Sequence, residues 1–305
     1  MSRLKTITNR ITNNPRMIIS YMNAAGLFNL LSDKTVLKIL WWVRTGKKLN
    51  LDKPITFNEK LQWLKLNNRD SKLTSMVDKF RVREYVAKTI GEDHLISLIA
   101  VWDKPDEIDF DALPDQFVLK CNHNAGVGLC ICRDKSSLNQ RQAKKKLEKG
   151  LSQNFYYSSR EWAYKDVQRK IICEKYMEDA SGNGLRDYKF FCFNGTAKFI
   201  YLSEGLENHN TASISFYDLD GNEMPFHRQD YKTFDHKPEM PDNLNEMIET
   251  ANTLATDINI PFVRIDLYSI KSKVYFSEMT FYPNSGYIPF DPEEWDATLG
   301  TWIQL

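Results

Sequence analysis

Near the C-terminal end of the chain, one arginine and two acidic residues are spaced as a strand pair would space the ligands of a cation. Arg264 and Asp266 alternate with apolar residues in Val263-Arg-Ile-Asp266, and Glu278 follows Asp266 by twelve residues. Side chains alternate along a strand, so Arg264 and Asp266 would point to one face. A hairpin would place Glu278 beside Asp266.

Two close carboxylates repel each other unless a cation lies between them. Mg2+ takes carboxylate and phosphate oxygens as ligands, and an arginine beside it can hold a transferring phosphoryl group. The pattern therefore predicts a magnesium site on Asp266 and Glu278, with Arg264 next to it. The structural alternative is an Arg–Asp pair on an exposed sheet face.

A second candidate feature is a loop of small residues that follows a lysine. Lys120 ends the apolar segment that begins at Phe117, and Asn122 to Gly128 then separate it from another apolar segment. Such a loop between two strands can place backbone N–H groups, here around Gly126 and Gly128, over phosphates. No helix follows the loop, which excludes the usual P-loop and dinucleotide-binding motifs. His123 in this loop is expected to make a structural hydrogen bond rather than act as a base.

Two further groups of residues suit the other parts of a nucleotide. Lys79 is expected to open a helix over residues 78–90, where it is either a phosphate ligand or a surface lysine. Glu174 and Lys175 lie at the end of an apolar strand, whose free backbone groups would bind an adenine edge. Met177 would pack on the adenine ring. The alternative for this segment is a strand edge that leads into a polar loop.

The elements that must position these residues change character along the chain. Residues 1–70 are mostly helical, and Thr56-Phe-Asn-Glu59 is a capping-box pattern for a helix to about Asn68. Further helices are expected over 78–90, 136–151 and 241–258. Strands are expected over 95–102, 116–121, 129–132, 171–177, 188–193, 197–202, 213–217, 262–269 and 274–279. Asn194–Gly195 and Asp220–Gly221 mark hairpin turns, so the sequence predicts an α+β fold with antiparallel sheets.

Composition describes an ordinary soluble chain of 305 residues, long enough for two or three lobes. No run approaches the roughly 18 apolar residues of a membrane helix, and the N-terminus has no signal-peptide pattern, so we expect a cytoplasmic location. The five cysteines lie in apolar, strand-like segments without a Cys-x-x-Cys pair, so we expect reduced core thiols rather than disulfides or zinc ligands.

Charge is distributed unevenly along the chain. Residues 1–50 hold nine basic residues and one acidic residue, whereas the remaining 255 residues hold 32 basic and 39 acidic residues. A basic arm of this kind suits a polyanion or the inner face of a membrane, and a solvated face on docked helices is the alternative. Nucleic-acid binding is not expected, because the basic charge is confined to one end and no recognition motif accompanies it.

Taken in chain order, these pieces resemble the ATP-grasp superfamily, in which two α+β lobes clamp ATP. The resemblance implies ATP and Mg2+ as cofactors, a cation from the strand around Asp187-Tyr-Lys189, and metal binding by the strand pair described above. The residues that it places at the phosphates, hinge and metal are Lys79, Lys120, Asn122, Gly126, Gly128, Glu174, Lys175, Met177, Lys189, Arg264, Asp266, Glu278 and Thr280.

A closer resemblance is to the TupA-like branch, carried by Thr56-Phe-Asn-Glu-Lys60, Asp78-Lys-Phe-Arg-Val-Arg83 and Phe276-Ser-Glu-Met-Thr-Phe-Tyr-Pro283. It implies a carboxylate–amine ligase that forms an amide through an acyl phosphate on a surface polysaccharide or lipid-linked precursor. One departure is Thr280, where many ATP-grasp enzymes place an asparagine; Asn284 is an alternative ligand. We expect a helical basic region over 1–75 and an ATP-grasp domain over 76–305, divided near residue 175 into an N-lobe and a C-lobe.

Other functions fit parts of the same pattern. A sugar phosphotransferase would keep the nucleotide fold, but it needs a base that the sequence does not identify. A glycosyltransferase would use a metal motif such as Asp218-Leu-Asp220, although the following Gly221 favours a hairpin turn there. A non-catalytic module would bind polysaccharide or membrane through the basic arm and the tryptophans Trp41, Trp42 and Trp63.

Overall fold

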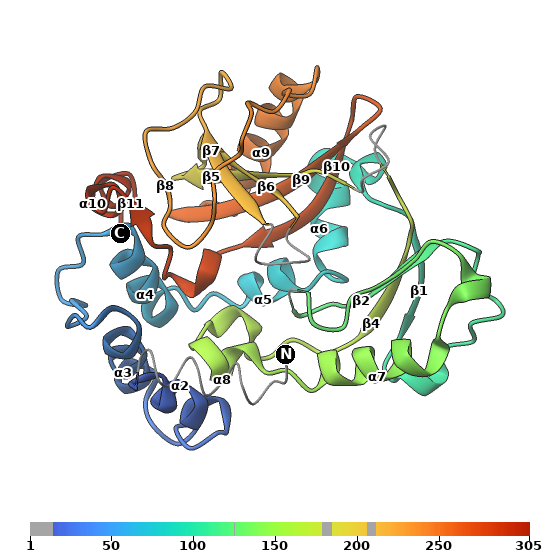
Figure 1. Cartoon of the computed structure of the whole chain (residues 1–305), viewed down its shortest axis with the longest axis horizontal. Helices are drawn as coiled ribbons and strands as arrows, with labels where there is room; N and C mark the ends of the chain where they lie inside the picture. The colour runs from blue at the N-terminus through green and yellow to red at the C-terminus, as the bar shows by residue number, and fades with distance from the viewer. Residues whose placement is uncertain (1–14, 125, 179–184, 206–211) are drawn as a thin grey trace.

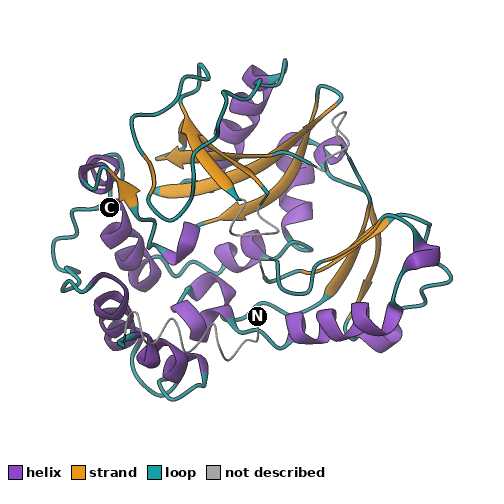
Figure 2. Cartoon of the chain, viewed as in Figure 1, coloured by secondary structure: helices purple, strands orange, loops and turns teal. Residues whose placement is uncertain are grey.

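The computed structural model describes residues 15–124, 126–178, 185–205 and 212–305. These residues form an α+β fold built on antiparallel sheets, as the hairpin pattern predicts (Figures 1 and 2). One sheet has the strand order β1-β4-β2-β3, a larger one has the order β10-β9-β5-β6-β7, and β8 pairs with β11. The strands are β1 Leu98–Trp102, β2 Phe117–Cys121, β3 Cys130–Cys132, β4 Ile171–Lys175, β5 Asp187–Phe193, β6 Thr196–Glu204, β7 Ser213–Tyr217, β8 His227–Arg228, β9 Phe262–Ile270, β10 Lys273–Thr280 and β11 Phe290–Asp291.

Helices surround these sheets, and short 3-10 turns lie in several of the connecting loops. The helices are α2 Met17–Ala24, α3 Asp33–Thr45, α4 Phe57–Asn67, α5 Lys72–Val77, α6 Val82–Ile90, α7 Gln140–Leu151, α8 Phe155–Ser159, α9 Leu244–Ile258 and α10 Glu294–Thr301. The 3-10 turns are η1 Glu92–His94, η2 Pro105–Glu107, η3 Lys135–Ser137, η4 Trp162–Tyr164 and η5 Pro283–Ser285. Among the described helices, none is long and apolar enough to cross a membrane.

Alternate residues of strand β2 are buried against α7, so the residues between them lie on the other face of the smaller sheet. Phe117, Leu119 and Cys121 of β2 are buried in a cluster that also contains Leu147 of α7. Lys120 lies between them in sequence and therefore points to the opposite face. The alternation in Phe117-Val-Leu-Lys-Cys121 thus covers one side of the sheet with α7 and leaves Lys120 on the other.

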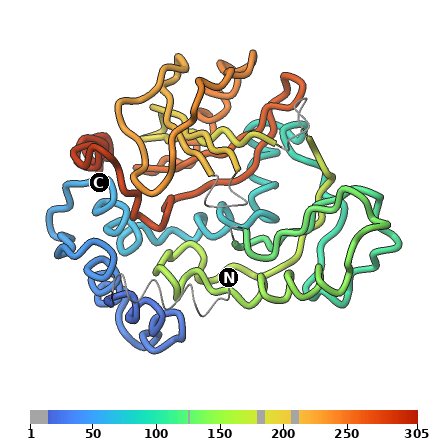
Figure 3. The backbone as a smooth tube through the Cα atoms, viewed as in Figure 1, coloured from blue at the N-terminus to red at the C-terminus, as the bar shows by residue number. Residues whose placement is uncertain are grey.

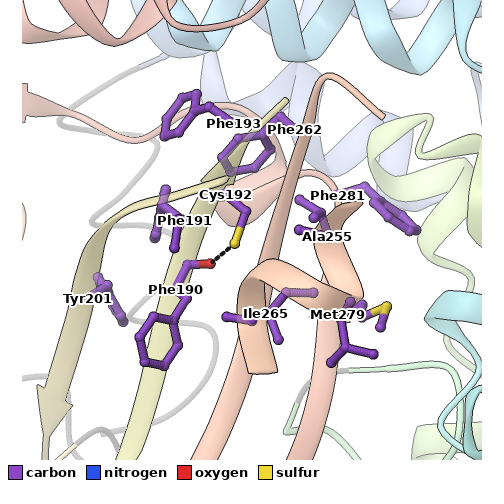
Figure 4. Packing of buried hydrophobic residues seen from close by; sticks show 14 of the residues in the cluster. Phe190, Phe191, Cys192, Phe193, Tyr201, Ala255, Phe262, Ile265, Met279 and Phe281 are labelled. Atoms are coloured by element: carbon purple, nitrogen blue, oxygen red, sulfur yellow. Dashed lines mark hydrogen bonds between the residues drawn. The ribbon is translucent and has the colours of Figure 1, made fainter. Parts of the chain in front are cut away.

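The larger sheet is built from hairpins and carries the main core. The turn between β5 and β6 contains Asn194 and Gly195, both with positive φ, as the Asn–Gly signal predicts. Helix α9 packs on this sheet through Met247, Ala251 and Leu254, which are fully buried. Figure 4 shows how side chains of β5, β9, β10 and α9 interlock in this core.

The N-terminal helices are anchored to this same core. The capping box predicted at Thr56 is present, since Thr56 accepts from the Glu59 N–H and Glu59 accepts from the Thr56 N–H. Phe57 then inserts its ring 4.9 Å from the centroid of Phe262 in β9. Figure 3 shows the C-terminal segment running beside α4, where Lys60 donates to the carbonyl of Ile303 at 2.7 Å. The division at residues 75 and 76 stays a prediction, but α4 shares its core with the larger sheet.

Some predicted boundaries are wrong at the helix starts. The helix expected over 78–90 begins at Val82, and Lys79 lies in the turn before it rather than inside it. Asp78 causes this offset, because its carboxylate accepts from the N–H groups of Phe80 and Arg81. Asn139 similarly delays α7 by capping it at the Gln142 N–H. Side-chain oxygens that accept from the unpaired N–H groups of the first turn therefore set where helices α6 and α7 begin.

Candidate functional site

The strand pair β9–β10 brings the predicted arginine and acids onto one face. Glu278 is registered opposite Asp266, and Thr280 is registered opposite Arg264, with an irregularity between Phe276 and Glu278. Arg264 donates from Nε to Asp266 Oδ1 at 2.7 Å and from Nη2 to Asp266 Oδ2 at 2.6 Å. Its Nη2 also lies 3.0 Å from Thr280 Oγ1 and 3.4 Å from Glu278 Oε1. The hairpin predicted from the spacing is therefore present, with all four side chains together.

A second cation comes from the neighbouring strand. Lys189 of β5 is registered opposite Asp266, and its Nζ lies 3.1 Å from Asp266 Oδ2. It also forms an ion pair with Asp187. Burial lowers the pKa of Lys189, but the charges of Asp187 and Asp266 outweigh it and raise that pKa above its usual value. Asp266 has 0% exposure, and its two oxygens are held by Arg264 and Lys189.

The third cation reaches this face from outside the larger sheet. Lys79, in the turn before α6, places Nζ 2.7 Å from Glu278 Oε2. The same Nζ donates to the backbone carbonyl of Asn124 at 3.1 Å. Burial raises the pKa of Glu278, but Lys79 and then Arg264 outweigh it and lower the pKa to about 2, so Glu278 is ionised at neutral pH. Lys79 thus connects the glycine-bearing loop to the carboxylates of β10.

A separate ion cluster lies on the smaller sheet. Lys120 of β2 places Nζ 2.6 Å from Glu174 Oε2 of β4, and Arg83 of α6 places Nη1 3.3 Å from Glu174 Oε1. Lys120 and Glu174, predicted separately for the phosphates and the adenine end, therefore contact each other directly. Lys175 is exposed at the strand end and Met177 is half-buried in the segment that follows. Their contact with an adenine ring stays a prediction.

The loop from Asn122 to Gly128 has a rigid base. The amide of Asn122 is buried, donates to Asp78 Oδ1 and to the Gln168 carbonyl, both at 2.8 Å, and accepts from the Lys170 N–H at 2.8 Å. The Asn122 carbonyl accepts from the Lys79 N–H at 2.9 Å. The polar groups of Asn122 therefore fix the start of the loop beside Lys79, and its predicted contact with a nucleotide stays a prediction.

The two glycines of this loop have different surroundings. Gly126 has φ +78° and an added Cβ would meet no atom within 4 Å, so it is exposed and open to a ligand. Gly128 has φ +86°, and an added Cβ would lie 2.7 Å from Cys121 Sγ and 3.0 Å from the Gly150 Cα. Gly128 therefore serves close packing against α7. Ala125, which precedes Gly126, lies outside the described residues.

The imidazole of His123 makes a hydrogen bond within the protein, as expected. Its Nε2 lies 3.2 Å from the carbonyl of Gln153. Burial lowers the pKa of His123 to about 4, so the ring is neutral at physiological pH. The structural hydrogen bond predicted for this residue is confirmed.

Several residues at the site were not selected from the sequence. The pKa of Tyr164 of η4 is raised well above its usual value, first by burial and then by the charges of Glu161 and Glu278. Asp187 lies beside Lys189, with burial raising its pKa. Alternation along β5 would have placed Asp187 on the face of Lys189. Nothing in the local sequence of Tyr164 indicates its interaction with Glu278.

The donor set fits a magnesium ion that is completed by phosphate and water. Within the described ranges, no three His, Cys, Asp or Glu side chains gather as a self-sufficient metal site would require. Asp266 and Glu278 supply two facing carboxylates, and the hydroxyl of Thr280 lies beside them. Mg2+ is often held by one or two carboxylates together with substrate phosphates, which is the set available here. Asn284 lies in η5 and donates to the Tyr287 carbonyl at 2.6 Å.

The rival Asp-x-Asp motif forms a turn. Asp218 Oδ1 accepts from the N–H groups of Asp220 at 3.0 Å and Asn222 at 2.7 Å. The carboxylate of Asp218 is used to close the loop between β7 and the residues that follow. This is the hairpin turn that Gly221 favoured in the sequence.

Two antiparallel sheets, one carrying Lys120 and the other carrying Lys189 and the arginine–acid hairpin β9–β10, define a protein of the ATP-grasp class. A family model described as TupA-like ATPgrasp matches residues 59–304. The chain therefore belongs to the TupA-like ATP-grasp family. No curated protein matches it.

Solved structures of similar fold include two D-alanine–D-alanine ligases and a synthetase. The ATP complex of the Bacillus anthracis ligase has 16% identity and a TM-score of 0.42, over 68% of this chain and 56% of that one. The Helicobacter pylori ligase has 14% identity and a TM-score of 0.45, over 81% and 69%. The ADP complex of N5-carboxyaminoimidazole ribonucleotide synthetase has 12% identity and a TM-score of 0.44, over 82% and 58%. The chain thus spans less than two thirds of the Bacillus anthracis ligase.

Proposed function

We propose that this protein is an ATP-dependent carboxylate–amine ligase. In the proposed reaction, a substrate carboxylate oxygen attacks the γ-phosphorus of ATP, and ADP leaves. The amine nitrogen then attacks the carbonyl carbon of the resulting acyl phosphate, and inorganic phosphate leaves as the amide forms. The observation that carries this proposal is the convergence of Lys79, Lys189 and Arg264 on the carboxylates of Asp266 and Glu278.

In the proposed reaction the cations of the site would bind the polyphosphate of ATP. Lys79 contacts Glu278 and Lys189 contacts Asp266, while Lys120 lies on the smaller sheet beside Glu174. Phosphoryl transfer is catalysed mainly by positioning and charge stabilisation, so such a set is sufficient without a protein nucleophile. Arg264 is fixed by two hydrogen bonds to Asp266, which orients its remaining donors toward Glu278 and Thr280.

Asp266 and Glu278 are the proposed magnesium ligands. A bound magnesium ion would neutralise charge on the phosphates and on the phosphoryl group in transfer. Glu278 suits this role because it is ionised at neutral pH, and because its carboxylate is partly exposed whereas that of Asp266 is buried. Thr280 holds the guanidinium of Arg264 beside them.

The thiols of the chain do not suit covalent catalysis. All five cysteines are free and buried. Burial raises the pKa of Cys121, the thiol beside the loop base, to about 11. A thiol with such a pKa is a poor nucleophile at neutral pH. This supports direct attack by the substrate carboxylate.

The loop around Gly126 is the proposed cover of the phosphates. It starts at a base fixed by Asn122 and is joined to the site through Lys79 and the carbonyl of Asn124. Exclusion of water would protect an acyl phosphate from hydrolysis. Backbone N–H groups near Gly126 would supply donors without adding side-chain bulk.

The substrate class is proposed from the TupA-like membership. The carboxylate would belong to a uronic acid of a surface polysaccharide or its lipid-linked precursor, and the amine to an amino acid or a small amine. The reaction would then take place in the cytoplasm, at the inner face of the membrane. Glycan assembly on a lipid carrier would bring the acceptor to that surface.

A product screen tests the proposal. The protein would be incubated with ATP, Mg2+, a uronic-acid glycan and a panel of amino acids, and ADP, phosphate and glycan mass would be followed. We expect ADP and free phosphate in equal amounts, together with a glycan mass gain equal to the amino acid minus one water. Phosphorylated glycan with ADP and no free phosphate would instead identify a phosphotransferase. Transfer of a sugar from a nucleotide sugar would contradict the ligase.

A further inference from the structure

The N-terminal helices carry an unusual concentration of exposed apolar side chains. Large hydrophobic residues that are exposed in the described chain number eleven, and six of them lie between residues 18 and 42. Five belong to α2 and the turn that follows it, which we call the apolar tip: Ile18, Met22, Leu27, Leu30 and Leu31. Exposed fractions reach 101% for Leu30, 59% for Leu27 and 52% for Ile18. Clustered exposure of this kind marks an interaction surface.

The most buried residue of helix α2 is polar. The one buried residue of α2 is Asn23, whose Nδ2 donates to the carbonyls of Tyr157 at 3.2 Å and Ser158 at 3.1 Å. A surface helix ordinarily buries its apolar side and exposes its polar one. Here the hydrogen bonds of Asn23 hold α2 against α8 and leave Ile18 and Met22 outside. The exposure of Ile18 and Met22 on the outer side is consistent with an apolar partner there.

The surroundings of the apolar tip are positively charged. Exposed cations follow on α3 and the loop after it, at Lys34, Lys38, Arg44 and Lys48, while Lys47 forms an ion pair with Glu293. The acid of this stretch, Asp33, is neutralised by Arg69 at 2.7 Å and Arg160 at 3.5 Å. The surface therefore presents apolar side chains surrounded by basic ones. This composition complements a membrane with anionic headgroups more closely than it complements an apolar protein surface.

We propose that the apolar tip inserts into the interface of a membrane that contains anionic lipids, while the lysines of α3 contact the headgroups. Helix α2 has eight residues, a length of about 12 Å, so it would lie in the interface and not cross it. Figure 1 places α2 and α3 together at one end of the molecule, away from the smaller sheet. The proposal deepens the proposed function, because a lipid-linked acceptor would be held at that surface.

The tip is connected to the site through a short stretch of chain. Asn23 holds the last turn of α8, and the next residues include Glu161 and Tyr164. Glu161 accepts from Ser285 of η5 at 2.7 Å, which joins this segment to the chain that follows β10. The tip is thus connected through α8 and Glu161 to the end of the strand that carries Glu278, which suits a substrate presented from that membrane.

Vesicle sedimentation with the full chain tests this inference. The vesicles would contain phosphatidylcholine alone or phosphatidylcholine with about one third phosphatidylglycerol, without ATP or glycan. We expect the protein to bind the anionic vesicles at least tenfold more tightly than vesicles of phosphatidylcholine alone. Binding to the anionic vesicles should weaken as the salt concentration is raised. The double variant Leu27→Ser/Leu30→Ser should reduce binding at least tenfold. The variant Lys34→Glu/Lys38→Glu should reduce binding to the anionic vesicles but leave the weak binding to phosphatidylcholine vesicles unchanged.

Ile55→Ser is the matched control, since Ile55 is another exposed apolar residue, with 62% exposure, outside the tip. It should bind like the unmodified protein. Circular dichroism and the thermal midpoint would verify that each variant is folded, which is expected because the changed side chains are exposed. Full binding by the Leu27→Ser/Leu30→Ser variant would overturn the proposal. A dimer in sedimentation velocity that this variant dissociates would assign the tip to a second copy instead. Because no nucleotide is present, failure here leaves the ligase proposal intact, and the reverse also holds.

Discussion

Lys79 Nζ lies 2.7 Å from Glu278 Oε2, and this contact joins the turn before α6 to strand β10. The lysine also bonds the Asn124 carbonyl of the glycine-bearing loop. One side chain therefore connects the two halves of the candidate site. Because Glu278 is a proposed metal ligand, a bound nucleotide and ion would change the partners of both groups at once.

The first prediction concerns Lys79. Lys79→Met should weaken ATP binding in the presence of Mg2+ by about tenfold or more, since a charge-assisted contact to phosphate contributes roughly 1.5–3 kcal/mol. Thermal shift and isothermal titration with ATP and Mg2+ would measure it. Lys88→Met is the matched control, because Lys88 is exposed on the adjacent α6. Equal affinities for the two variants would contradict the role assigned to Lys79.

The second prediction concerns the buried carboxylate of Asp266. Asp266→Asn removes the counter-charge of Arg264 and Lys189, whose side chains are 14% and 8% exposed. Breaking a buried ion pair costs about 3–5 kcal/mol, so we expect a loss of stability of that order together with loss of ATP turnover. Urea unfolding and phosphate release would measure the two effects.

Asp220→Asn is the matched control for that variant, because Asp220 is an exposed acid in the turn of the rival Asp-x-Asp motif. It should leave stability and turnover unchanged. Glu278→Gln should also abolish magnesium-dependent turnover, but with a smaller loss of stability, since Glu278 is less buried than Asp266. Turnover that survives in Asp266→Asn would remove the metal assignment.

The third prediction concerns the pH dependence that Lys65 imposes on stability. Lys65 of α4 is fully buried and donates to the carbonyls of Ser159 at 3.0 Å and Ser285 at 2.9 Å. Burial lowers its pKa to about 7 against the attraction of Glu161. Between pH 7 and about 10.4, the unfolded chain binds the proton that the folded chain has released, so the free energy of unfolding rises with pH.

Lys65→Met lacks this titration. The difference in unfolding free energy between the unmodified protein and Lys65→Met should therefore shift in favour of the unmodified protein as pH increases from 7 to 10. Urea unfolding at intervals of one pH unit would measure it. Lys53→Met, at an exposed position, should follow the unmodified protein in parallel. Parallel curves for Lys65→Met as well would show that the buried amine does not titrate in this range.

The fourth prediction separates the two glycines of the loop. Both have positive φ, so an alanine at either position carries a backbone cost of about 1–2 kcal/mol. Gly128→Ala adds a clash with Cys121 and with the Gly150 backbone, whereas Gly126→Ala meets open space. Gly128→Ala should therefore lower the thermal midpoint more, and Gly126→Ala should mainly weaken ATP binding. The reverse order would show that the loop packs differently.

Local sequence patterns were sufficient for much of this site. The alternation in Val263-Arg-Ile-Asp266 placed Arg264 and Asp266 on one face, and the hairpin brought Glu278 beside them. The capping box at Thr56 marked the start of α4 correctly. These features depend on neighbouring residues alone, since strand alternation and helix capping are decided within a few positions of the chain.

Long-range packing determined which partners the polar side chains of the site contact. Asn122 belonged to a predicted phosphate loop, yet its amide is used by Asp78, Gln168 and Lys170. The charge of Glu278 raises the pKa of Tyr164, although nothing in the local sequence indicates this interaction. The fate of a polar side chain depends on which distant groups approach it, and no window of sequence contains those partners.

The sequence by itself determined the antiparallel hairpins, the order of the cationic and acidic residues, and the basic character of the N-terminal region. Only the tertiary structure decided that Lys79 meets Glu278, that Asn23 is buried while apolar residues of α2 are exposed, and that Lys65 is enclosed. The physical reason is the range of the interactions. Strand alternation and charge are properties of short segments, whereas burial and ion pairing arise when segments far apart in the chain are packed together.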